Sequence, residues 1–199
     1  MIDVRKIFYV GGNLTLYSKE IFTIPNLLSC IRLSLIPVFL LVYINADYTA
    51  DYYLAAFIIV LSGITDLLDG FIARHFQQIT ELGKVLDPIA DKLTQAAIAF
   101  SLMFRFPYMW LLVILFVVKE LFMGISGLLL LRKNKKLDGA KWFGKVSTAI
   151  FYVTMGILIA FPNIHYDIYL VLLIITALFL SLSFIMYIRE HMRLYQRTD

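Results

Sequence analysis

Four aspartates occur within a short stretch of an otherwise apolar chain. Asp66 and Asp69 are three residues apart, and Asp87 and Asp91 are four residues apart. On a helix, residues at either spacing lie on one face, about one turn apart. A helical hairpin would bring the two pairs together, and four carboxylates in one place repel one another unless they are protonated or bound to cations.

The chemistry predicted from this stretch is metal binding combined with phosphate binding. Carboxylate oxygens are the ligands that Mg²⁺ and Mn²⁺ prefer. Gly70 follows Asp69 on the same helix, where the missing side chain lets another group approach closely. Ala73 is also small, Arg74 carries a guanidinium suited to phosphate, and Gly83 is expected in the turn of the hairpin.

The rest of the chain predicts a membrane setting for these charges. Of its 199 residues, 61% are hydrophobic, whereas soluble domains are nearer half apolar. Several apolar runs approach the roughly 20 residues that cross a bilayer. We therefore predict an all-α integral membrane fold with six transmembrane helices, at Ile24–Ile44, Tyr52–Ala73, Leu86–Phe106, Tyr108–Leu131, Trp142–Phe161 and Ile168–Ile188.

An alternative interpretation treats the aspartates as surface carboxylates paired with Arg74, Lys84 and Lys92. Ionisable residues within membrane spans are energetically costly and usually functional. Because several of them are predicted to converge here, the sequence favours a functional site.

Basic residues outside the spans are strongly biased to one side of the membrane. Arg105 is the only one in the connections predicted on the other side, so the positive-inside rule places both termini and the carboxylates at the cytoplasmic face. The residues on the predicted cytoplasmic side are Arg5, Lys6, Lys19, Arg74, Lys84, Arg132, Lys133, Lys135, Lys136, Lys141, Arg189, Arg193 and Arg197.

Two regions are expected: an N-terminal interfacial segment over residues 1–22 and the six-helix domain over residues 23–199. The first segment mixes apolar residues with Arg5, Lys6 and Lys19, as in segments that lie among lipid headgroups. Membrane lipids are the expected surroundings, in a bacterial cell membrane, and no nucleic acid partner is expected.

At the aspartates the chain resembles the CDP-alcohol phosphotransferase family. All eight signature positions match, in the pattern Asp66-x2-Asp69-Gly70-x2-Ala73-Arg74-x8-Gly83-x3-Asp87-x3-Asp91. The opening of the first span, Ile24–Pro37, is similar to members that use CDP-diacylglycerol.

The resemblance implies two divalent metals, Mg²⁺ or Mn²⁺, held by the four aspartates in each active site. Asp91 would also be the general base that takes the proton from the acceptor hydroxyl. The nucleotide pocket would be shaped by Gly70, Ala73, Arg74 and Gly83, with Asn26 and Arg32 of the first span nearby. It further implies release of CMP and assembly as a homodimer.

The acceptor alcohol is less strongly indicated. Lys119, Lys145 and Arg32 are the candidate acceptor-binding residues, and they would suit a phosphorylated alcohol such as glycerol 3-phosphate, as in phosphatidylglycerophosphate synthases. However, Ser147 stands where those enzymes tend to have a second lysine. Thr65–Arg74 is also similar to CMP-forming cardiolipin synthases, whose acceptor is phosphatidylglycerol.

A non-enzymatic alternative is a metal-ion transporter that uses the four aspartates as its ion site. A transport site is expected near the membrane midplane, with access to both sides. The predicted position of the carboxylates near one membrane face favours the enzyme.

Overall fold

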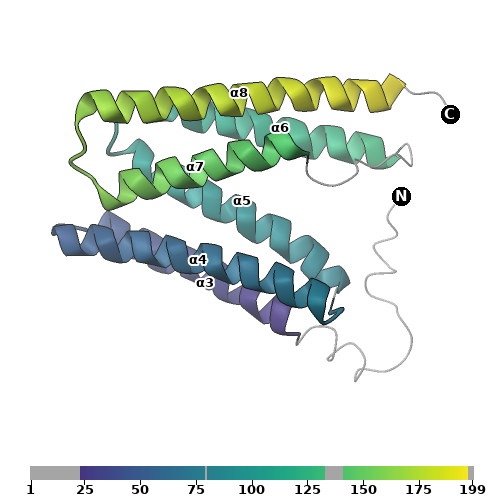
Figure 1. The fold of residues 1–199 in the computed structure, drawn as a ribbon, viewed down its shortest axis with the longest axis horizontal. Coiled ribbons are helices and arrows are strands. Elements are labelled where there is room, and N and C mark those ends of the chain that lie inside the picture. Colours follow the sequence, from purple (N-terminus) through teal and green to yellow (C-terminus); the bar gives the residue numbers. More distant parts are fainter. Residues whose placement is uncertain (1–22, 79, 133–140, 197–199) are drawn as a thin grey trace. The chain divides into compact units, whose positions relative to one another are not determined.

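The computed structural model describes residues 23–78, 80–132 and 141–196. Within this part the side chains of Arg74, Glu81, Lys84 and Leu131 are not described, and the predicted interfacial segment, residues 1–22, lies outside it. All regular structure in the described residues is helical (Figure 1). The helices are α3 (Ile24–Ile44), α4 (Thr49–His75), α5 (Glu81–Met103), α6 (Met109–Arg132), α7 (Trp142–Ala160) and α8 (Tyr166–Gln196).

Each predicted span coincides with a helix, although α5 begins five residues before its span and α8 ends eight residues after its span. The all-α class is confirmed. Five of them are long and apolar enough to cross a membrane, namely α3, α4, α6, α7 and α8. Helix α5 is not among these five. It carries Asp87, Asp91 and Lys92, and these charged residues lower its mean hydropathy. The protein is therefore a helical integral membrane protein.

The chain divides into two compact units, which meet in sequence at Ser101 and Leu102. The first contains α3, α4 and most of α5. Helices α3 and α4 run antiparallel and side by side (Figure 1). The hydroxyl of Thr23 caps α3 by accepting from the Asn26 amide, and Pro25 occupies the first turn, where its missing N–H is harmless.

The connection from α3 to α4 is fixed by hydrogen bonds to a single carboxylate. Asp51 Oδ2 accepts from the backbone amides of Tyr48 at 2.9 Å and Asp47 at 3.1 Å. An acidic residue in the first turn also interacts favourably with the helix dipole. Helix α4 therefore has a defined start at Thr49, 17 residues before Asp66.

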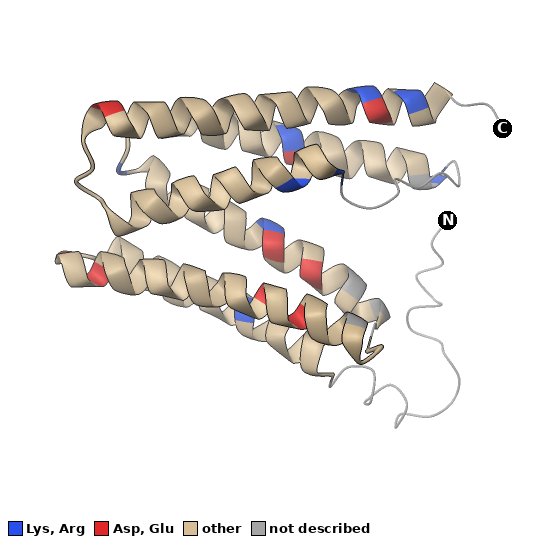
Figure 2. Cartoon of the chain, in the orientation of Figure 1, with Lys and Arg blue, Asp and Glu red and all other residues tan. Residues whose placement is uncertain are grey.

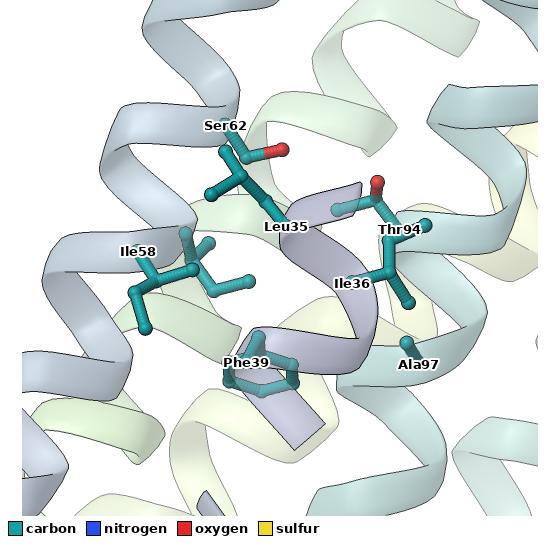
Figure 3. A pocket seen from close by; sticks show the side chains of 8 residues that line it. Leu35, Ile36, Phe39, Ile58, Ser62, Thr94 and Ala97 are labelled. Atoms are coloured by element: carbon teal, nitrogen blue, oxygen red, sulfur yellow. The ribbon is translucent and has the colours of Figure 1, made fainter. Parts of the chain in front are cut away.

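The first unit has its apolar core next to the aspartates. A narrow crevice is lined from α3, α4 and α5 by Leu35, Ile36, Phe39, Ile58, Ile59, Ser62, Thr94 and Ala97 (Figure 3). Phe39 and Ile58 are buried. Ser62 is one helical turn before Asp66, and Thr94 is about one turn after Asp91. Packing in this crevice thus fixes the three helices close to the carboxylates.

The second unit contains α6, α7 and α8, and both α6 and α7 pack against α8. A tight turn around Pro107 precedes α6, with Tyr108 in the left-handed region at φ 61°. The Tyr169 hydroxyl donates to the Pro107 carbonyl oxygen, and the ring of Tyr169 stacks on Phe106 with a centroid separation of 5.0 Å. These contacts attach the start of α8 to the turn that precedes α6.

Candidate active site

Three polar residues, spaced three apart, interrupt the apolar sequence of α3. Asn26, Ser29 and Arg32 are 2%, 0% and 2% exposed. Side chains at this spacing lie on one face of a helix, and buried polar groups require hydrogen-bond or charge partners. The stripe is therefore expected to face polar groups on neighbouring helices.

Arg32 contacts both aspartates of the first pair. Its guanidinium nitrogens lie 2.6 Å from Asp66 Oδ1 and within hydrogen-bond distance of Asp69 Oδ2. Asp69 is buried, whereas the side chain of Asp66 is 49% exposed. Figure 2 shows acidic positions on α4 and α5 and a basic position on α3, on helices that are otherwise mostly uncharged. One guanidinium thus balances a buried and a half-exposed carboxylate.

Ser29 connects the first aspartate pair to the second. Its hydroxyl donates to Asp87 Oδ1 at 2.6 Å, and the same oxygen lies 3.5 Å from Asp69 Oδ2. It is also 3.1 Å from the Pro25 carbonyl oxygen, one turn back along α3. One hydroxyl on α3 therefore lies between carboxylates of α4 and α5.

The third member of the stripe fixes the start of α5. Asn26 Oδ1 accepts from the Thr80 hydroxyl at 2.9 Å, and Thr80 Oγ1 accepts from the Gly83 amide at 2.9 Å. A Cβ added at Gly83 would lie 2.9 Å from Asn26 Oδ1 and 3.0 Å from Thr80 Oγ1. Gly83 was expected in the turn, but it lies in the first turn of α5, where the lack of a side chain permits this close approach.

Asp91 has partners on its own helix. Gln95 Nε2 donates to both carboxylate oxygens at 3.2 Å, and Lys92 Nζ lies 4.0 Å from Oδ2. Both Asp87 and Asp91 are close enough to Asp66 to interact electrostatically with it. The hairpin thus brings the second pair near the first, as the spacing predicted.

The donors at this site fit a hard divalent cation. Two carboxylates of α4 contact the positive charge of Arg32, and a carboxylate of α5 accepts from the Ser29 hydroxyl beside them. Within residues 23–78, 80–132 and 141–196, no three His, Cys, Asp or Glu side chains are close enough together to hold one metal ion. Metal coordination by all four aspartates stays a prediction.

The remaining predicted nucleotide-pocket residues follow the first pair on α4. Gly70 and Ala73 are partly buried, and the Gly70 backbone amide hydrogen-bonds to the Asp69 carboxylate. Arg74 lies in the last turn of α4, but its side chain is not among those described. On the same helix, Leu67 and Phe71 are 72% and 57% exposed.

The candidate acceptor lysines lie in the second unit. Lys119 is buried on α6, and its Nζ lies 2.7 Å from Glu120 Oε1. Lys145 is exposed near the start of α7. Ser147, two residues further along α7, is 2% exposed. Lys119 therefore has a neighbouring carboxylate as partner, whereas Lys145 is accessible.

Sequence reasoning missed Ser29, Thr80 and Gln95. Ser29 carried a usable signal, because polar residues at positions 26, 29 and 32 repeat every three residues in an apolar helix. Thr80 has the residue type of a helix cap, three positions before Gly83. Gln95 lies four residues after Asp91, a spacing that places both on one helix face.

Comparison with known proteins identifies the family. The sequence profile described as CDP-alcohol phosphatidyltransferase matches residues 22–187. The chain belongs to the CDP-alcohol phosphatidyltransferase family. The predicted family is thus confirmed, and the ion-transport alternative receives no support.

Relatives within this family share a substantial part of the chain. Proteins from Escherichia coli (strain K12), Escherichia coli O157:H7 and Shigella sonnei are each 34% identical over 147 residues. The match covers 72% of this chain and 80% of each relative. All three are named CDP-diacylglycerol–glycerol-3-phosphate 3-phosphatidyltransferase.

Proposed function

We propose that this protein transfers the phosphatidyl group of CDP-diacylglycerol to glycerol 3-phosphate and releases CMP. The observation that carries the proposal is the convergence of Asp66, Asp69 and Asp87 on Ser29 and Arg32. This geometry occurs in a chain that is 34% identical to enzymes named for that reaction. A phosphatidyltransferase needs positive charge and hard ligands beside a pyrophosphate, and the site offers both.

The proposed reaction is a substitution at the phosphorus that carries the diacylglycerol. An oxygen of the acceptor hydroxyl forms a bond to this phosphorus, the bond to the CMP oxygen breaks, and CMP leaves with the electron pair. Asp91 accepts the hydroxyl proton. Its carboxylate is 31% exposed, so it is accessible to an acceptor, and Gln95 orients both of its oxygens. A positioned carboxylate can act as such a base.

The four aspartates would hold Mg²⁺ or Mn²⁺, two ions per active site. When bound, these metals would polarise the phosphorus and offset the charge that develops in phosphoryl transfer. The chain's own contribution is to aim the carboxylates: Arg32 orients Asp66 and Asp69, and Ser29 orients Asp87. Gly70, Ala73, Arg74 and Gly83 would line the nucleotide pocket.

For the acceptor, we propose that Lys145 and Lys119 bind the phosphate of glycerol 3-phosphate. Lys145 is exposed and can reach an anion directly. Lys119 already pairs with Glu120, so a bound phosphate and the Glu120 carboxylate would both interact with the Lys119 ammonium group. We further propose that the site faces the cytoplasm, as the distribution of Lys and Arg predicts, and that the protein forms a homodimer.

The test measures CMP release by the purified protein in lipid nanodiscs containing CDP-diacylglycerol, with Mg²⁺ and either glycerol 3-phosphate or phosphatidylglycerol. Release with glycerol 3-phosphate, abolished by EDTA, is expected. Release with phosphatidylglycerol alone would instead establish cardiolipin synthesis. Absence of CMP with both acceptors would contradict the proposal. For the Asp91→Asn variant in the same assay, Asp167→Asn is the matched control, because the Asp167 carboxylate is 81% exposed and pairs with His165 at the start of α8.

A further inference from the structure

The contacts of Arg32 are those of an internal counter-ion. The guanidinium is 2% exposed and contacts one carboxylate that is nearly as deeply buried, Asp69, and one that is half exposed, Asp66. Buried charges are retained only when they are paired. Without a nearby positive charge, Asp66 and Asp69 would repel each other and Asp87. Arg32 therefore supplies the positive charge in direct contact with Asp66 and Asp69.

The guanidinium is well placed but not fully bonded. Nε and Nη1 of Arg32 have no hydrogen-bond partner among the described groups. The contact of Nη1 with Asp66 is therefore an ion pair without a hydrogen bond, and the side chain is not held by its whole set of donors. A divalent ion at the same carboxylates would meet a resident positive charge close by. The guanidinium already contacts an oxygen of each of these carboxylates, and like charges repel, so an ion bound to Asp66 and Asp69 would compete with it for these oxygens.

We propose that Arg32 is a resident counter-ion that holds Asp66 and Asp69 before a divalent metal binds and competes with the metal for them. Ser29 is a positioning residue, because its hydroxyl holds the Asp87 carboxylate next to Asp69. We call Ser29 and Arg32 the α3 clamp. The inference rests on the proposed function only in that a divalent metal belongs to this site.

The clamp predicts two effects of opposite sign for loss of Arg32. Removing the guanidinium leaves the carboxylates uncompensated, so the metal-free protein becomes less stable. The same change removes the competitor, so the metal binds more tightly. If Arg32 acted only on the acceptor, its loss would raise the KM for glycerol 3-phosphate. It would change neither the stability of the metal-free protein nor the affinity for the metal.

The experiment uses the full chain in nanodiscs and measures Mn²⁺ binding by electron paramagnetic resonance, together with the melting temperature in EDTA and in saturating Mn²⁺. For Arg32→Gln we expect the Kd for Mn²⁺ to fall about tenfold. Its melting temperature should be below wild type in EDTA, with the difference reduced in Mn²⁺. Arg132→Gln, which removes an exposed positive charge at the end of α6, is the control and should leave Mn²⁺ binding unchanged.

Ser29 is tested with a conservative rescue. Ser29→Ala removes the hydroxyl that orients Asp87, and we expect the Kd for Mn²⁺ to rise about tenfold because a metal ligand loses its orienting partner. Ser29→Thr keeps a hydroxyl and should restore binding. Ser34→Ala is the matched control, since Ser34 also donates to a carbonyl one turn back on α3, that of Cys30, but is exposed.

Several results would overturn the clamp. These are wild-type protein that binds no Mn²⁺, Arg32→Gln that binds Mn²⁺ no more tightly than wild type, or Arg32→Gln that melts like wild type in EDTA. If Arg32→Gln does not fold, Arg32→Lys keeps the competing charge but loses the planar fork. The clamp then predicts that the Kd for Mn²⁺ stays close to that of wild type, and a Kd about tenfold lower would count against the clamp. Clamp behaviour without CMP release would refute the proposed function while supporting the clamp.

Discussion

The two aspartate pairs have the same chemistry but different partners. On α4, Asp66 and Asp69 share one buried guanidinium from α3. On α5, Asp87 accepts from a serine hydroxyl of α3, and Asp91 accepts from a glutamine of its own helix. The α4 pair is thus balanced by charge and the α5 pair mainly by neutral donors. The comparison indicates that α4 provides the fixed side of the site, whereas α5 keeps more of its negative charge available for a metal or a proton.

The largest effect is expected from Asp91→Asn, which removes the proposed base from the α5 pair. We expect kcat to fall about 10³-fold, because an amide cannot take the acceptor proton. The melting temperature should stay close to wild type, since Gln95 can still hydrogen-bond to the new side chain. CMP release under saturating substrates measures kcat, and thermal melting in nanodiscs measures the melting temperature. Near-normal turnover would remove Asp91 from the mechanism.

A second prediction applies the same substitution to each pair. In EDTA, Asp69→Asn leaves the buried Arg32 with one charged partner fewer, so we expect a loss of about 3 kcal/mol in the free energy of unfolding. Asp87→Asn exchanges a carboxylate for an amide opposite the neutral Ser29, and we expect a loss of about 1 kcal/mol. Denaturation in mild detergent with EDTA gives both values. Equal losses would show that the two pairs do not differ in the way described.

A third prediction separates the placement of helix α5 from the charges of the site. Gly83→Ala adds a Cβ against Asn26 and Thr80, and Asn26 is buried with its oxygen already hydrogen-bonded. We expect α5 to shift slightly relative to α3, at a cost of about 1–2 kcal/mol in stability. Because this shift would move Asp87 away from the Ser29 hydroxyl that orients it, the affinity for Mn²⁺ should fall as well. Gly63→Ala on α4 is the control, since nothing lies within 4 Å of its added Cβ; equal effects would contradict the close-approach argument.

Much of this site could be predicted because its signals are local. The span Ile24–Ile44 was predicted with the bounds that the structure shows, since α3 has a threonine cap, an early proline and a mostly apolar sequence. The shared faces of the two aspartate pairs follow from spacing alone. Helix α5 begins five residues before the predicted span because hydropathy detects apolar sequence, and its first turn is polar.

What the sequence could not provide is pairing across helices. Arg32 was predicted to bind the acceptor, yet the structure pairs it with carboxylates 34 and 37 residues further along the chain. A guanidinium suits a phosphate and a carboxylate equally well, so residue type does not distinguish them. The bond from Ser29 to Asp87 similarly depends on how α3 packs against α5, which no local pattern specifies.

The exposure of Leu67 and Phe71 has a consequence for how a lipid substrate reaches the enzyme. They are largely exposed on the helix that carries Asp66 and Asp69, so α4 presents acyl-compatible side chains immediately beside its carboxylates. A lipid substrate that arrives along this helix is supplied in two dimensions. The rate should then follow the mole fraction of that lipid in the bilayer, and diluting the membrane with inert lipid should slow turnover even when the total amount of substrate in the tube is unchanged.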